Sequence, residues 1–159
     1  MASLSLPLWP EGTPVLDYRG KPTGIPALRA VNLPLVRGDL QQCADTVLRL
    51  RATFVRQQGG DPAFRYTSGW VSNWSAWAAG KRPQVSGNVV TVSATGKIDN
   101  SDTAFEAWLT DLFMYAGTHS LVKDTVAVDG GTSRLKPGDI VVYGGSPGHA
   151  VVLLDSAVD

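Results

Sequence analysis

The sequence predicts an α+β fold in which two main helices pack on a small antiparallel sheet. Residues 39–58 and 101–116 carry apolar side chains at three- and four-residue spacing, which is typical of helices with one buried face. Residues 85–93 and 140–154 are rich in β-forming residues around a glycine-containing turn, and each predicts a hairpin. Because helices and strands do not alternate as βαβ units, a parallel sheet is not expected.

An irregular arm is expected ahead of this core. Residues 1–38 carry more than half of the ten prolines, and the sequence changes character at Gly38. Each proline pushes the preceding residue toward extended geometry, which predicts short strands at Val15–Tyr18 and Leu28–Leu33 at most. We therefore expect a single domain overall, with the arm over residues 1–38 and the α+β core over residues 39–159.

Capping residues mark the ends of the two long helices. Asp39 and Gln42 have capping-box spacing and predict the start of the first helix, and Gly59 predicts its end. Ser101 or Asp102 predicts the start of the second. Both helices are long enough to bury a continuous apolar stripe.

The composition excludes several classes of function. Fourteen basic and fourteen acidic side chains give a net charge of zero without a basic cluster, so no nucleic-acid partner is expected. No apolar run approaches the roughly 20 residues that span a bilayer, so no membrane span is expected. The first ten residues lack the features of a secretion signal. With one cysteine and two histidines, we expect no disulfide, metal site or cofactor.

Two side chains are candidates for chemistry. Cys43 lies near the start of the first helix, in DLQQCADTVLRLRA, and His149 lies between a glycine-rich turn and a strand, in PGDIVVYGGSPGHAVVLLD. A helix N-terminus stabilises a thiolate, and an adjacent imidazole can take the proton and return it to a leaving group. The alternative for Cys43 is simple packing on the apolar stripe of its helix. The alternative for His149 is a residue at the start of a strand, bonded to a nearby carbonyl oxygen.

The tryptophan-rich stretch before the first hairpin is the candidate for ligand contact. Trp70, Trp74 and Trp77 have helical spacing, and Ser72 or Asn73 can start a short helix there. Trp70, Asn73 and Trp74 are the predicted substrate-binding residues, since indole rings can line a groove that stacks on sugar or peptide. The alternatives are a core stripe for the tryptophans and a capping role for Asn73.

The order of a Cys-bearing helix, a Pro-Gly-Asp turn, an apolar strand, a Gly-His pair and a second apolar strand resembles the papain-like amidases and peptidases of the NlpC and CHAP type. That resemblance implies a helix N-terminus that presents the nucleophile and a strand pair that presents the general base. The chain also resembles the bacterial domain of unknown function 4846. The stretches that carry this second resemblance are DLQQCADTVLRLRA, YTSGWVSNWSAW, MYAGTHSL and GGSPGHAVVLLDSAV.

These patterns favour a cysteine amidase or peptidase that cleaves peptide amide bonds, and the resemblance implies peptidoglycan peptides as its substrates. Cys43 attacks as the thiolate, His149 acts as general base and then as general acid, and backbone N–H groups around Gln42 and Cys43 hold the oxyanion. The rival hypothesis is a non-catalytic module of the same fold that binds a peptide or glycan, or that scaffolds a partner.

The C-terminal end raises a further expectation. The chain stops shortly after His149, before the segment from which papain-like enzymes take the polar group that orients the histidine. Asp155 lies about 20 Å along an extended strand and cannot take that place. We therefore expect a fragment, a shortened homologue or an inactive relative, with a sheet edge left open after Leu154 that favours self-association. The sequence assigns no compartment: the resemblance points to the cell envelope, and the absent signal peptide otherwise favours the cytoplasm.

Overall fold

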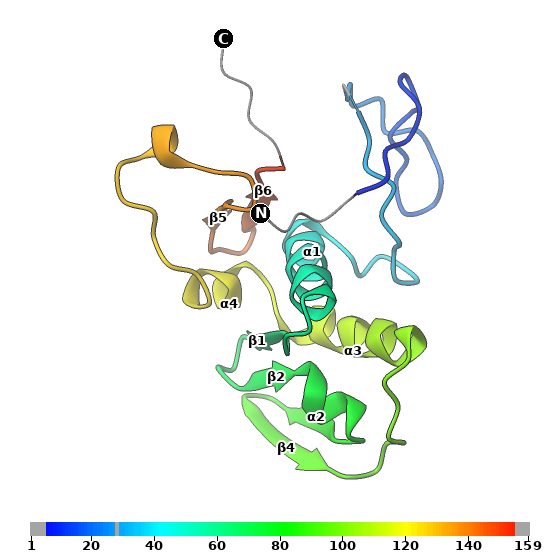
Figure 1. Ribbon diagram of the computed structural model, residues 1–159, viewed down its shortest axis with the longest axis vertical. Coiled ribbons are helices and arrows are strands. Elements are labelled where there is room, and N and C mark those ends of the chain that lie inside the picture. Colours follow the sequence, from blue (N-terminus) through cyan, green and yellow to red (C-terminus); the bar gives the residue numbers. More distant parts are fainter. Residues whose placement is uncertain (1–5, 28, 155–159) are drawn as a thin grey trace. The chain divides into compact units, whose positions relative to one another are not determined.

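A computed structural model describes residues 6–27 and 29–154 of the chain. Two compact units are distinguished, Met1–Leu40 and Gln41–Asp159. All the helices and multi-residue strands that the structure describes belong to the second unit (Figure 1).

The described part of the first unit contains isolated bridges instead of the expected short strands. Leu16 pairs with Pro22 in one antiparallel bridge, within the first expected strand. Val31 pairs with Leu8 in another, within the second expected strand, of which Leu28 lies outside the described residues. Proline donates no backbone hydrogen bond, which limits how far such pairing can extend.

The second unit is α+β, as the sequence predicts. Its elements follow in the order α1 (Cys43–Gln57), β1 (Ala63–Arg65), β2 (Val71–Asn73), α2 (Trp74–Ala78), β3 (Arg82–Ser86), β4 (Val89–Ser93), α3 (Asp102–Tyr115), α4 (Thr118–Lys123), the 3-10 turn η1 (Thr132–Arg134), β5 (Ile140–Tyr143) and β6 (His149–Val152).

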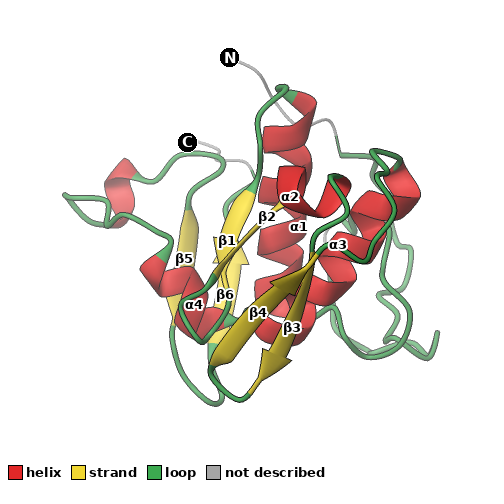
Figure 2. Cartoon of the chain, turned by 90° about the horizontal axis from the view of Figure 1, so that it is seen from below, coloured by secondary structure: helices red, strands yellow, loops and turns green. Residues whose placement is uncertain are grey.

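The described strands form three separate antiparallel pairs, β1–β2, β3–β4 and β5–β6. The expectation of one small sheet is therefore wrong, although the hairpins predicted at residues 85–93 and 140–154 are confirmed as β3–β4 and β5–β6. Gly87 turns between β3 and β4 with a φ of 58°, a conformation that suits glycine in a tight hairpin. Helices take the place of further strands as packing partners: α1 lies against β6, and α4 lies against β5 and β1 (Figure 2).

The first helix begins later than its sequence pattern predicts. The N-cap is Gln42, whose backbone N–H donates to the carboxylate of Asp45 at 3.0 Å, and Thr46 N–H donates to the Gln42 carbonyl at 2.9 Å. The predicted cap at Asp39 is wrong, because Asp45 satisfies the N-terminal backbone from inside the first turn. Cys43 is consequently the first residue of α1.

Aromatic rings and aliphatic side chains of α1, α3 and the β1–β2 hairpin fill the core. Trp108 and Leu112 of α3 are fully buried. The rings of Trp74 and Phe105 meet edge to face, with 5.2 Å between their centroids. The indole N–H of Trp108 donates to the hydroxyl of buried Ser72 at 2.9 Å, so the largest core side chain leaves no polar atom without a partner.

A buried arginine connects α1 to α3. Arg49 is 3% exposed, and its two terminal nitrogens donate to the two carboxylate oxygens of Glu106 at 2.6 and 2.7 Å. Its Nε donates to the side-chain oxygen of Gln41 at 2.9 Å, which lies just before the helix. This fork geometry compensates for the cost of removing the guanidinium from water.

We predict that this ion pair is strongly coupled. Glu106→Ala leaves the Arg49 guanidinium buried without its carboxylate and is expected to cost about 1–3 kcal/mol of unfolding free energy, less than for a fully buried pair because Glu106 is partly exposed. The double variant Arg49→Met/Glu106→Leu is expected to cost less than the sum of its two single variants. Urea denaturation gives the unfolding free energies of the wild type, the two single variants and the double variant. If the costs of the two single variants simply added up in the double variant, the coupling between Arg49 and Glu106 would be contradicted.

Asp45 generates a prediction about pH. Burial raises the pKa of this carboxyl above its usual value, against the lowering effect of the hydrogen bond from Gln42 N–H. When the folded-state pKa is the higher one, the carboxyl contributes most to the unfolding free energy below its unfolded-state pKa of about 3.9. This contribution is lost as the pH rises through the folded-state pKa. The unfolding free energy of the wild type minus that of Asp45→Asn should therefore fall as pH rises from about 3 through the raised folded-state pKa of Asp45.

The control for Asp45→Asn is Asp39→Asn, which changes an exposed carboxyl just before the helix. Denaturation curves over the same pH range should show a smaller change for this variant. A difference that rises with pH at Asp45, or an equal loss at Asp39, would be inconsistent with the observed cap.

Candidate functional site

Cys43 occupies the tip of α1. As the first helical residue it is half-buried, with a free thiol, at the end of the helix where backbone N–H groups have no intrahelical partner. These groups and the helix dipole favour negative charge. A cap at Asp39, as predicted from the sequence, would have placed Cys43 one turn further into the helix, where this effect is weaker.

His149 is the first residue of β6, and the strand that it begins packs against the helix that Cys43 begins. The side chain is exposed, whereas the next residue, Ala150, is buried, so the two residues lie on opposite faces of the hairpin. On β5, Tyr143 is the cross-strand partner of His149. The helix of Cys43 and the strand of His149 are therefore neighbours, although about a hundred residues separate them in sequence.

The glycine-rich turn before His149 is pressed against the first residue of α4. A Cβ atom on Gly148 would lie 2.1 Å from the hydroxyl oxygen of Thr118, and one on Gly145 would lie 2.7 Å from the carbonyl oxygen of Pro147. Thr118 donates to the carbonyl of Gly145 at 3.3 Å. A side chain at either position would therefore clash, with Thr118 of α4 at Gly148 and with the backbone of the turn itself at Gly145. This contact between the turn and α4 was not foreseen from the sequence.

The groups that would complete a cysteine-protease site differ from those expected. Gln42 N–H is already bonded to Asp45, so it is not a free oxyanion donor. No hydrogen bond to the His149 ring is formed by the residues described between 6 and 154, and Asp155 lies outside them. His119, the other histidine of the chain, is the second residue of α4.

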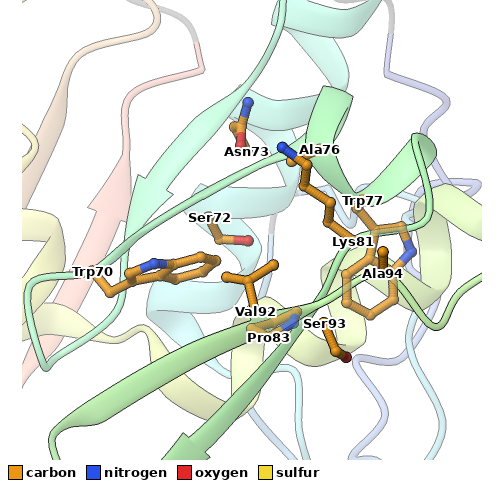
Figure 3. A pocket seen from close by; sticks show the side chains of 10 residues that line it. All are labelled: Trp70, Ser72, Asn73, Ala76, Trp77, Lys81, Pro83, Val92, Ser93 and Ala94. Carbon is orange, nitrogen blue, oxygen red and sulfur yellow. The ribbon is translucent and has the colours of Figure 1, made fainter.

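A pocket lies elsewhere in the second unit, between β2–α2 and the β3–β4 hairpin (Figure 3). Its volume is about 440 Å³, within the range of small-ligand sites. Trp70 and Asn73, both predicted to contact substrate, line it together with Trp77. Trp74, the third predicted residue, is buried in the core against α3.

The remaining wall of the pocket was not foreseen from the sequence. It comes from Lys81, Pro83, Val92, Ser93 and Ala94, at the ends of the β3–β4 hairpin. Neither Cys43 nor His149 belongs to the lining. The only signal in the sequence for this wall was the very short connection between α2 and the β3–β4 hairpin.

Within the described residues, no helix is both long and apolar enough to cross a bilayer. The same part of the chain contains no group of three or more His, Cys, Asp or Glu side chains arranged to hold a metal ion.

Comparison with known proteins identifies the family of the chain. The family model described as "Domain of unknown function (4846)" matches residues 4–159, which is nearly the whole sequence. No curated protein matches significantly. No solved structure does so either, so a papain-like architecture has no structural neighbour to support it. On the strength of the family match, the chain belongs to the domain of unknown function 4846 family.

Proposed function

We propose that this domain is a papain-like cysteine hydrolase that cleaves peptide amide bonds with Cys43 and His149. The observation that supports the proposal is the packing of α1, which begins at Cys43, against β6, which begins at His149. A nucleophile at a helix tip and a base on an adjacent strand are the two parts that thiol-dependent acyl transfer requires.

In the proposed reaction, His149 takes the thiol proton and the Cys43 sulfur attacks the amide carbonyl carbon. The tetrahedral intermediate collapses as the imidazolium protonates the departing amine, which leaves a thioester on Cys43. His149 then removes a proton from water, and the resulting hydroxide attacks the thioester. The carboxylic acid leaves, and the proton returns to the thiol.

The oxyanion donors in this proposal are the backbone N–H of Cys43 and the side-chain amide of Gln42. The Cys43 N–H lies at the first helical position, where no intrahelical acceptor exists. The Gln42 side chain is exposed at the N-cap beside it. Two donors at a helix tip stabilise charge that develops on the carbonyl oxygen. Peptidoglycan peptides are the first substrates to test, on the basis of the NlpC and CHAP resemblance.

Binding without catalysis is the second candidate. The pocket lined by Trp70, Asn73 and Trp77, called the tryptophan pocket below, favours it. The pocket is formed without Cys43 or His149, so a ligand can occupy it whether or not the thiol reacts. In that case Cys43→Ala leaves ligand affinity unchanged.

The hydrolase proposal predicts an activated thiol. At pH 7 a small electrophile such as iodoacetamide should alkylate Cys43 about tenfold faster than it alkylates glutathione, because the helix tip and the imidazole stabilise the thiolate. His149→Ala should remove most of this advantage. His119→Ala is the matched control, since it removes the other exposed imidazole of the chain, and it should leave the rate unchanged.

Mass spectrometry of the intact protein follows this alkylation, and the same samples can be incubated with purified peptidoglycan peptides. Cleavage by the wild type and none by Cys43→Ala is the expected pattern. A Cys43 rate equal to that of glutathione, or one insensitive to His149→Ala, would rule out the proposed pair.

Self-association through the β5–β6 hairpin remains a prediction. The face of this hairpin that carries His149 also exposes Val141, Tyr143 and Val151, which leaves apolar surface available to a second chain. Analytical ultracentrifugation should detect dimers that Val151→Lys weakens. A monomer at all accessible concentrations would contradict the prediction.

A further inference from the structure

The tryptophan pocket has walls that are fixed before any ligand arrives. Trp70 and Trp77 lie on opposite sides of it (Figure 3). Behind Trp70 stands the ring of Tyr66, at 5.0 Å between centroids, and the guanidinium of Arg82 lies 4.0 Å from the ring centre of Trp77. Because both indoles are held by neighbours, a ligand does not have to order them on binding.

Arg82 is itself held in place. Its NH1 nitrogen donates to the carbonyl oxygens of Trp77 and Lys81 at 2.7 and 2.8 Å. This connects the end of α2 to the start of β3 and keeps the guanidinium stacked on the indole. The charge of Arg82 is thereby used within the wall, and the cation that remains for a ligand is Lys81.

The side chain of Asn73 and the nitrogen of Lys81 lie on one side of the pocket (Figure 3). The amide nitrogen of Asn73 donates to the Asp61 carboxylate at 2.9 Å and to the Ser75 hydroxyl at 2.8 Å. The amide oxygen is therefore turned the other way, toward the pocket (Figure 3). Lys81 extends from the Trp77 side toward Asn73, is exposed, and forms no ion pair with the described residues.

These features define the chemistry of a ligand. Two indole faces suit a ring whose C–H bonds carry slight positive charge, since the faces of indole are negative. The Lys81 ammonium requires an anionic group, and the Asn73 oxygen requires a hydroxyl donor next to it. A purely aromatic acid would leave the Asn73 oxygen without a donor, whereas a sugar acid supplies a ring, a carboxylate and an adjacent hydroxyl.

We propose that this pocket binds a pyranose sugar that carries a carboxylate, with the ring between Trp70 and Trp77 and the carboxylate on Lys81. The inference deepens the binding candidate above and does not depend on the chemistry of Cys43. It assigns a ligand class to a site that is separate from the proposed catalytic pair.

Glucuronate, glucose and phenylacetate separate the contributions of ring and charge. Saturation-transfer NMR with the full chain should show glucuronate binding more tightly than either of the other two. Lys81→Met keeps the alkyl stem but removes the charge, and it should weaken glucuronate binding about tenfold, to the level of glucose. Lys123→Met removes an exposed lysine from α4, outside the pocket, and should change nothing.

Each alternative outcome overturns the assignment. Equal binding of glucose and glucuronate would exclude carboxylate recognition, and stronger binding of phenylacetate would indicate an aromatic acid instead. Binding of none of the three would mean that the pocket is not a sugar site. Cys43→Ala should retain glucuronate binding, and a loss would place the sugar at the helix tip; failure of the thiol-reactivity test alone leaves this inference standing.

Discussion

The second unit depends on the contact between a buried guanidinium and the groups that surround it. Desolvating an arginine costs several kcal/mol, so Arg49 can stay in the interior of α1 only if its donors are satisfied. Glu106 of α3 accepts two of them, and Gln41, just before the helix, accepts a third. These bonds restrict rotation of α1 about its own axis. The bond to Gln41 also holds the segment that leads into Cys43.

The two candidate sites are built in different ways. The proposed Cys43–His149 pair depends on long-range packing, because its residues come from opposite ends of the second unit and from two elements, α1 and β6, that contact each other. The tryptophan pocket is local, since its lining lies between Trp70 and Ala94. A substitution that loosens α1 is therefore expected to affect the pair more than the pocket. Binding and chemistry can then be lost separately, which makes the two proposals experimentally independent.

Elements with unambiguous local signals could be predicted from the sequence. α3 begins after Ser101, whose hydroxyl accepts the Ala104 N–H, and β5 begins at Ile140, where the hairpin predicted over residues 140–154 begins. The start of α1 was misplaced because aspartate is a better N-cap than glutamine, and nothing local shows that Asp45 caps the helix from within. The division of the strands into three pairs, and the meeting of the β3–β4 hairpin with Trp70, are decided by tertiary packing. Local sequence patterns do not encode such contacts.

The central claim is that folding places the sulfur of Cys43 beside the imidazole of His149. The most direct measurement is cross-linking with 1,3-dibromoacetone, whose short three-carbon bridge can join a thiol to an imidazole nitrogen only when the two are in close proximity. Peptide mapping by mass spectrometry should find Cys43 joined to His149 and not to His119. Cys43 alkylated without a bridge, or bridged to another residue, would contradict the account.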